Sequence, residues 1–380
     1  MNEKISAFLA ERIAANDFPS AVYLVAEKGE IVFQDALGYA VVEPERIEAR
    51  PDTIYDLASL TKPLVTGLLY AKLFGEEGLE DGIAIDLRDS HPNFHGIHFR
   101  SPLSLLTHTS GLPAWRPFYL LVKERREILG QFLEIAPEAV TPRVVYSDLN
   151  FIALMFLIEA AAGCRIDVVA GKEIVEPLGL KDTWFNPPAE LKIRTAASEK
   201  GNEYERRTCV ELGYLDDDGV KSPPAHADGS DLLRDRLIWG EVHDGNAWFM
   251  GGAAGHAGLF STAEEVFKIA LQFLPNYTTL LKPETTELFR TNFTLGMNEA
   301  RSLAFQLAET PGSTAGSRMS PSAFGHLGFT GTSLWIDPVT ERIFILLTNR
   351  THAHDLPFVN INAVRRRFHD LANEALDANK

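Results

Sequence analysis

The sequence predicts an α+β fold: an antiparallel sheet that both ends of the chain form, flanked by helices, with a mostly helical region inserted. The runs 21–26 and 30–37 near the start, and 333–336 and 342–348 near the end, are apolar and rich in strand-forming residues. Residues 60–273 instead contain segments whose apolar side chains recur at helical spacing. Strand-rich ends around a helical middle favour one shared sheet.

The two ends of the chain carry the clearest elements. Residues 3–16 predict a helix, and Lys28-Gly29 predicts the tight turn of a hairpin between the first two strands. Near the other end, the sequence from Asp337 to Thr340 is a favourable turn between the last two strands. Residues 358–377 then predict a long helix, because apolar residues recur there at helical spacing.

The middle of the chain predicts short helices joined by loops rich in proline, glycine and aspartate. The segments with helical periodicity are 60–75, 101–108, 119–135, 149–162, 167–175 and 264–273. Residues 185–247 are expected to form a long, partly irregular excursion. We expect a single domain over residues 1–380, with a sheet subdomain at about 1–58 and 300–380 and a helical subdomain at about 59–299.

The composition excludes several classes of function. With 45% hydrophobic and 23% charged residues, the chain is typical of a globular protein. A net charge of −16 argues against a nucleic-acid partner, which needs clustered lysine and arginine. No stretch approaches the roughly 18 apolar residues of a membrane span, and the N-terminus lacks the apolar core of a signal peptide. We therefore expect no membrane anchor and a cytoplasmic location as written; a removed leader would imply the periplasm or the cell exterior.

No metal or cofactor is expected. Cys164 and Cys209 are the only cysteines, too few for a disulfide framework or a zinc motif. A loop contains His91, His95 and His98, but no carboxylate pattern accompanies them. His243, Asp244 and His256 could line a cleft without taking part in chemistry.

The first segment with catalytic potential is Ser59-Leu60-Thr61-Lys62. A serine and a lysine three residues apart on a helix share one face, so the amine can reach the hydroxyl. Pro63 would clash with the Ser59 carbonyl inside a helix, and this clash disappears if the helix begins at Ser59. Ser59 would then lie at a helix N-terminus, where unpaired N–H groups favour an oxyanion. A capping serine with a surface lysine is the structural alternative.

The second segment is Tyr146-Ser147-Asp148, which precedes an apolar helix. Ser147 or Asp148 could simply cap that helix, with Tyr146 as a packing aromatic. Alternatively, Tyr146 could move protons, because a nearby lysine cation favours the deprotonated form of a phenol.

The third segment runs from His326 to Thr332 and leads into the strand at 333–336. Two glycines in such a segment mark a bulge or a close approach of the backbone to another group. An irregular edge strand is one interpretation. The other is a strand whose main chain binds substrate, with the Phe329 N–H as an oxyanion donor.

The order of these segments resembles the serine β-lactamase and penicillin-binding protein superfamily, in particular its class C-like branch of esterases and DD-peptidases. That family shows SxxK, then Y-x-N, then K/H-T-G, and this chain has SLTK at 59, YSD at 146 and HLG at 326. Longer family-like stretches occur at 105–113, 242–262 and 328–338. The resemblance covers residues 18 to 350 or so.

The resemblance implies acyl transfer through a covalent Ser59 acyl-enzyme. Lys62 would activate Ser59, Tyr146 would move protons, and the N–H groups of Ser59 and Phe329 would form the oxyanion hole. The residues expected to contact the substrate are Asp148, His326, Gly328 and Thr330.

Two departures from the family pattern affect the expected substrate. Asp148 replaces an asparagine, and its carboxylate should keep Lys62 protonated, which makes Tyr146 the better base. His326 and Leu327 replace a lysine and a hydroxyl residue that help bind a substrate carboxylate, and an imidazole is mostly neutral at pH 7.

We therefore expect an esterase or peptidase with weak β-lactamase activity that acts on a small ester, amide or peptide. The alternatives are a D-alanyl-D-alanine carboxypeptidase, a β-lactamase, or a catalytically silent module that binds a peptide or drug.

Overall fold

The computed structural model describes residues 1–79, 101–135, 143–216 and 233–378. His91, His95 and His98, considered above for a metal, lie outside the described residues. A seven-stranded sheet dominates the described chain, with the strand order β3-β2-β1-β12-β11-β10-β9 and antiparallel neighbours throughout. The strands are β1 (Ser20–Glu27), β2 (Glu30–Val41), β3 (Ile47–Glu48), β9 (Gln306–Leu307), β10 (Phe324–Leu327), β11 (Ser333–Asp337) and β12 (Arg342–Thr348).

The predicted fold class is confirmed, because the centre of the sheet joins the two ends of the chain. Strand β1 pairs with β12 from Ala21↔Thr348 to Glu27↔Arg342. The predicted hairpin is also present: Lys28 and Gly29 have φ values of 53° and 80°, which suit a tight turn between β1 and β2.

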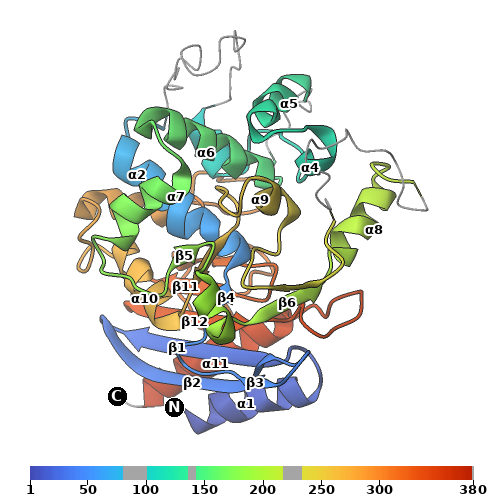
Figure 1. Cartoon of the computed structure of the whole chain (residues 1–380). Coiled ribbons are helices and arrows are strands. Elements are labelled where there is room, and N and C mark those ends of the chain that lie inside the picture. Colours follow the sequence, from blue (N-terminus) through green and yellow to red (C-terminus); the bar gives the residue numbers. More distant parts are fainter. Residues whose placement is uncertain (80–100, 136–142, 217–232, 379–380) are drawn as a thin grey trace.

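The two faces of the sheet pack against different helices. Tyr23 and Val25 of β1 belong to a core shared with α1 (Glu3–Ala14) and α11 (Asn362–Ala378). Val22 and Leu24 point to the opposite face and join the larger core of the helical region. Figure 1 shows α1 below the sheet and the middle helices above it. The alternation of strand side chains thus produces a sheet between two layers of helices.

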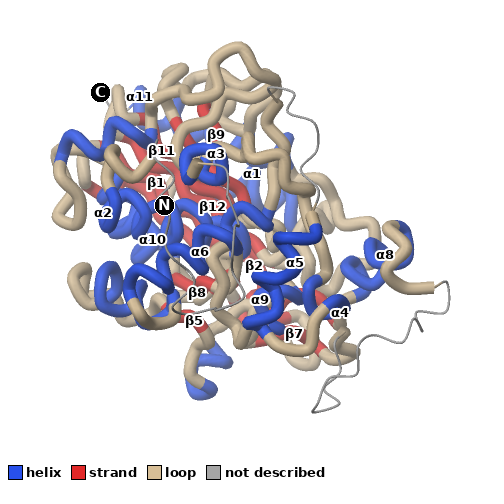
Figure 2. The backbone as a smooth tube through the Cα atoms, turned by 90° about the horizontal axis from the view of Figure 1, so that it is seen from above, coloured by secondary structure: helices blue, strands red, loops and turns tan. Residues whose placement is uncertain are grey.

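The middle region contains helices in each segment where periodicity predicted one, with several differences in their bounds, and two helices, α8 and α9, that periodicity did not predict. They are α2 (Leu68–Phe74), α3 (Pro102–Leu106), α4 (Phe118–Leu121), α5 (Ile128–Glu134), α6 (Asp148–Ala162), α7 (Ile166–Ala170), α8 (Glu203–Glu211), α9 (Gly245–Phe249) and α10 (Ala263–Ala270), with short strands β4 (Tyr55–Asp56), β5 (Trp184–Phe185), β6 (Ala197–Lys200), β7 (Leu237–Trp239) and β8 (Leu259–Ser261). Figure 2 shows α6 and α10 across the sheet and α8 at the periphery. None of the described helices is long and apolar enough to cross a lipid bilayer.

Two predicted helices were wrong in extent. The segment 119–135 is divided into α4, a 3₁₀ turn at Arg125–Glu127, and α5, because Val122 and Glu124 are extended. The last helix begins at Asn362 rather than at residue 358.

Residues 58–74 form the helical segment that carries Ser59. A 3₁₀ turn (Ala58–Leu60) is followed by a π-helical stretch (Lys62–Gly67) and then by α2. Ser59 therefore lies in the first turn, as the position of Pro63 predicted. Ala58 has a φ of 48°, a left-handed conformation that is uncommon for alanine and typical of functional sites.

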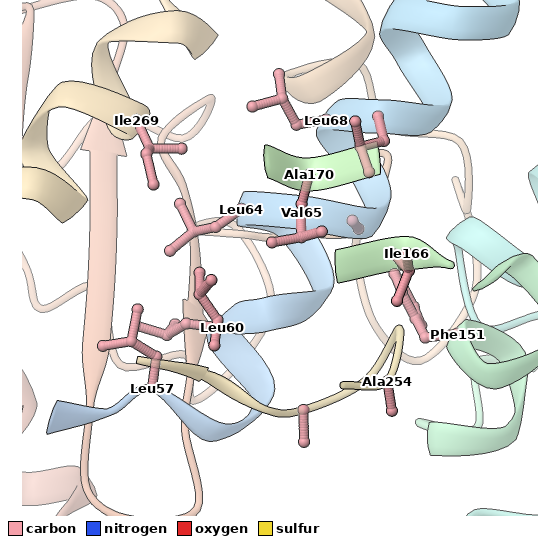
Figure 3. Packing of buried hydrophobic residues seen from close by; sticks show 14 of the residues in the cluster. Leu57, Leu60, Leu64, Val65, Leu68, Phe151, Ile166, Ala170, Ala254 and Ile269 are labelled. Carbon is pink, nitrogen blue, oxygen red and sulfur yellow. The ribbon is translucent and has the colours of Figure 1, made fainter. Parts of the chain in front are cut away.

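This segment is anchored by apolar side chains. Leu57, Leu60, Leu64 and Leu68 are fully buried, and Figure 3 shows them packed in the helical core beside Ile269. Among residues 53–71, Ser59 is the one residue that is not buried. Tight packing on all other sides fixes the position of the Ser59 hydroxyl.

Candidate active site

A cavity of about 1010 Å³ opens beside Ser59. Its walls come from segments that are far apart in the sequence. They include Ser59, Tyr146, Asp148, His243, Asp244, Arg301, His326, Gly328 and Phe329. Such a volume is at the upper end of the range for small-molecule sites.

Lys62 lies at the centre of the polar network beside the cavity. Its Nζ donates to the Ser59 Oγ over 2.8 Å and to the His256 main-chain oxygen over 3.1 Å. The same Nζ lies 2.6 Å from the Asp148 Oδ1. The ammonium group therefore has two hydrogen-bond acceptors and the Asp148 carboxylate as its ion-pair partner. The structural alternative of a surface lysine is excluded, because the Lys62 side chain is 0% exposed.

The surroundings of Lys62 raise its pKa above the usual value. Burial alone would lower this pKa, but the Asp148 carboxylate and Tyr146 outweigh burial. Lys62 is thus an ammonium ion at neutral pH, in agreement with the expected effect of Asp148. An ammonium group has no lone pair and cannot accept a proton.

Tyr146 is held in a cluster of rings and cations. Its ring lies 5.1 Å from the Lys62 Nζ and 5.6 Å from the Arg301 guanidinium carbon. The rings of His108 and His326 lie 4.6 Å and 5.8 Å from the Tyr146 ring. Tyr146 is therefore packed between two cations and two imidazole rings.

Asp148 begins α6, and the preceding Ser147 does not cap this helix with its side chain. The Ser147 Oγ donates to the Pro113 oxygen instead, and its N–H donates to His108 Nδ1. The Asp148 carboxylate, located at the helix N-terminus where the dipole favours an anion, is free to pair with Lys62. Capping of α6 therefore does not account for this segment by itself, because Tyr146 and Asp148 also line the cavity.

His326 is buried on the cavity wall with a defined tautomer. Its Nδ1 lies 2.9 Å from the Leu327 main-chain oxygen, which can only accept, so Nδ1 carries the hydrogen. Burial, together with the charges of Lys62 and Arg301, holds its pKa well below the usual value. The Nε2 is therefore an unprotonated acceptor, and it has no hydrogen-bond partner among the described residues.

The three remaining expected residues have different positions. Phe329 and Gly328 line the cavity in the turn between β10 and β11. The Gly328 N–H donates to the Thr332 oxygen, so it is used within the turn. The expectation that Thr330 contacts substrate is not supported, because its buried hydroxyl donates to the Asp56 oxygen over 2.7 Å.

Three residues of the site, two on the cavity wall and one packed against Tyr146, were not predicted from the sequence. Arg301 and Glu205 lie in segments without any motif, and both line the cavity wall. His108 lies in the family-like stretch 105–113, and this was the only indication in the sequence that His108 belongs to the site. Its Nδ1 accepts from the Ser147 N–H, and burial keeps its pKa well below the usual value.

The His256–Asp244 pair lies next to Lys62. His256 Nε2 is 2.9 Å from Asp244 Oδ1, which also accepts from the Ala247 N–H and so caps α9. Asp148, Asp244 and His256 each place one potential metal-binding atom within 4.8 Å of the others. The Lys62 ammonium already supplies a positive charge to Asp148 at this position.

Comparisons with known proteins identify the relatives of the chain. A family model described as Beta-lactamase matches residues 5–366. An Escherichia coli (strain K12) protein named "Putative D-alanyl-D-alanine carboxypeptidase" is 30% identical over 370 residues, covering 88% of this chain and 79% of that protein.

Solved structures show the same fold at lower identity. One described as a class C beta-lactamase has a TM-score of 0.69 at 15% identity, covering 97% of this chain and 95% of that one. The hydrolase EstCE1, described as having promiscuous acyltransferase activity, has a TM-score of 0.68 at 17% identity, with 97% of both chains covered. The match over nearly the whole chain shows that this protein belongs to the beta-lactamase family and is a serine hydrolase of that family.

Proposed function

We propose that Ser59 is the nucleophile and that the protein cleaves an ester or amide through a Ser59 acyl-enzyme. The observation that carries this proposal is the 2.8 Å hydrogen bond from Lys62 to the Ser59 Oγ at the wall of the cavity. Because the Ser59 oxygen accepts from Lys62, its own hydrogen is directed to another group. The ammonium group favours loss of this hydrogen to a base, because it stabilises negative charge on the Ser59 oxygen.

Tyr146 is the general base in this proposal, and Lys62 is the cation that stabilises its phenolate. Tyr146 takes the Ser59 hydrogen as the Oγ–carbon bond forms, and gives it to the leaving oxygen or nitrogen when that bond breaks. Water then attacks the acyl-enzyme, gives its proton to Tyr146, and releases Ser59 and the acid. Lys62 holds its own three hydrogens throughout.

The main-chain N–H groups of Ser59 and Phe329 form the oxyanion hole in this scheme. Ser59 lies in the first turn of a helical segment, where N–H groups have no intrahelical acceptor. Phe329 follows the end of β10 in a turn on the same cavity wall. Asp148 and His326 complete the substrate contacts proposed here.

The proposed substrate is a small ester or peptide, with weak activity on β-lactams. His326 is neutral and offers an acceptor, which repels rather than binds a carboxylate. The buried guanidinium of Arg365 donates to the Gly328 and Thr332 oxygens and to Asn362, so the fold uses most of its donors. Turnover of nitrocefin with kcat/KM above about 10⁵ M⁻¹s⁻¹ would contradict this substrate preference.

A D-alanyl-D-alanine carboxypeptidase is the second candidate, and it is supported by the printed name of the Escherichia coli relative. Paired peptides ending in D-Ala-D-Ala, with a free or an amidated carboxyl group, distinguish the two proposals. A carboxypeptidase prefers the free acid by a large factor, whereas the proposed esterase or peptidase does not.

The decisive experiment is the intact mass of the protein after incubation with a fluorophosphonate. We expect one covalent adduct at Ser59 and none in Ser59→Ala, with Ser104→Ala, a change at a serine of α3, as the matched control that keeps the adduct. Labelling of Ser59→Ala at the wild-type rate would refute the nucleophile. Absence of an adduct with any fluorophosphonate or penicillin would favour the silent binding module instead.

A further inference from the structure

We propose that Tyr204, Phe329 and Phe358 form an aromatic subsite for the acyl part of the substrate. This subsite would accept a flat, apolar group, above all a phenyl ring, attached close to the scissile carbonyl. The inference rests on the proposed function, because it places the acyl group relative to Ser59. Beyond that function, the subsite defines the chemical class of the preferred substrate, an ester or amide of an aromatic acid.

The three rings form one continuous surface on the cavity wall. The Tyr204 and Phe329 rings lie 4.7 Å apart, the Phe329 and Phe358 rings 5.9 Å, and the Tyr204 and Phe358 rings 6.1 Å. All three residues line the same cavity as Ser59. Tyr204 comes from α8, Phe329 from the turn after β10, and Phe358 from the segment before α11. Separate parts of the fold thus converge on one aromatic patch.

Two further cavity-lining side chains, His243 and Arg350, pack against the Phe329 ring of the patch. The buried His243 ring stacks on Phe329 at 5.4 Å, and its Nε2 lies 2.7 Å from the Glu199 carboxylate. The Arg350 guanidinium lies 5.0 Å above the Phe329 ring, and its Nε donates to the Phe329 oxygen over 2.7 Å. Supported side chains lose little conformational entropy when a ligand binds, which favours affinity.

The patch also retains apolar surface that a ligand could cover. Tyr204 is 41% exposed, and Phe329 and Phe358 are only partly buried. Rings grouped in this way around a cavity form an exposed apolar patch, which in proteins marks a binding site. A phenyl group placed among them would gain edge-to-face contacts and bury apolar area on both sides.

The position of Tyr146 assigns the patch to the acyl side. Tyr146 contacts the rings of His108 and His326, whereas the ring neighbours of Phe329 are Tyr204, His243 and Phe358. Among the described residues, no ring contact joins Tyr146 to the patch. In the proposed mechanism Tyr146 protonates the leaving atom, so the leaving group lies beside Tyr146. The acyl group then extends from the carbonyl carbon toward Phe329 and the patch.

The test compares p-nitrophenyl acetate with p-nitrophenyl phenylacetate, which share a leaving group and differ only in the acyl part. We expect the wild-type protein to favour the phenylacetate by about tenfold or more in kcat/KM. Tyr204→Ala and Phe358→Ala should each reduce this ratio by roughly threefold to tenfold. Val359→Ala, a change at an exposed neighbour outside the cavity lining, should keep the wild-type ratio. Thermal unfolding of each variant confirms that it is folded.

A second measurement uses only the wild-type protein. Benzylboronic and methylboronic acids form the same tetrahedral adduct with a serine hydroxyl, and we expect the benzyl compound to inhibit about tenfold more strongly. Equal inhibition, or an ester ratio that Tyr204→Ala and Phe358→Ala leave unchanged, would overturn the aromatic subsite. A wild-type protein that hydrolyses neither ester and forms no Ser59 adduct would overturn the proposed function instead, so the two failures are distinguishable.

Discussion

The Lys62 Nζ and the Asp148 Oδ1 lie 2.6 Å apart, with the lysine fully buried and the carboxylate at the edge of the cavity. This pair decides which group can accept a proton during catalysis. As long as Asp148 is ionised, Lys62 remains an ammonium donor to Ser59.

Asp148→Asn is expected to lower the pKa of Lys62, because burial then acts without its main counterweight. In the wild type, the raised pKa contributes stability below the usual lysine value, and this stability is lost as the pH rises through the raised value. In the variant the pKa of Lys62 is lowered by folding instead of raised. The stability of the variant therefore rises as the pH increases toward the usual pKa of lysine. The stability difference, measured by urea unfolding, should be about 1–3 kcal/mol at pH 7 and smaller at pH 10. A difference that is independent of pH would contradict this account.

Tyr146→Phe is expected to reduce kcat by about 10²–10⁴ with a small change in KM, because it removes only the group that transfers protons. The ring, and with it the contacts to His108 and His326, is kept. Tyr277→Phe, at a half-buried site outside the cavity lining where the hydroxyl donates to Glu341, serves as the control. Steady-state kinetics with p-nitrophenyl acetate measure the effect, and an unchanged kcat would exclude Tyr146 as the base.

The effect of Glu205→Gln on stability, relative to the wild type, is expected to be more favourable at pH 8 than at pH 5. Burial, and then repulsion from Asp244, raises the pKa of Glu205 to about 7. A carboxyl group whose pKa is raised by folding costs stability as the pH rises from its usual value to the raised one. The wild type should therefore lose on the order of 1–3 kcal/mol from this group between pH 5 and pH 8. Urea unfolding of both proteins at the two pH values should show a flatter profile for the variant.

Gly328→Ala is expected to reduce both stability and activity. A Cβ at this position would lie 2.6 Å from the Leu57 main-chain oxygen and would clash with the Thr332 side chain. The backbone would have to move at Leu57, which is two residues before Ser59. This would lower the free energy of unfolding by about 1–3 kcal/mol. Gly130→Ala in α5, where nothing lies within 4 Å of an added Cβ, should be neutral or slightly stabilising. Thermal unfolding and ester kinetics of both variants test the comparison.

The sequence predicted the parts of the site that depend on local spacing. Ser59 and Lys62 meet because they are three residues apart in the first turns of a helical segment, and Pro63 showed where that segment begins. The apolar, strand-forming runs near the two ends of the chain likewise predicted the shared sheet.

The parts that depend on tertiary approach were not predictable. Arg301 reaches the Tyr146 ring from an irregular stretch without periodicity or motif. The Thr330 hydroxyl turns toward the Asp56 oxygen because the β10–β11 turn packs against the segment before Ser59, and nothing near Thr330 in the sequence shows this. The predicted helix over 119–135 was interrupted because backbone conformations at Val122 and Glu124 follow from packing rather than from the apolar pattern.

The pairing of β1 with β12 has a consequence for biosynthesis. Ala21 and Thr348 are partners in the centre of the sheet, so the ribosome must add more than 300 residues between them. At about 5–20 residues per second, the nascent first hairpin waits for tens of seconds before its partner is translated. Because His326 and Phe329 also follow Ser59 by more than 260 residues, the hydrolase acquires its active site only after that long intervening stretch has been translated.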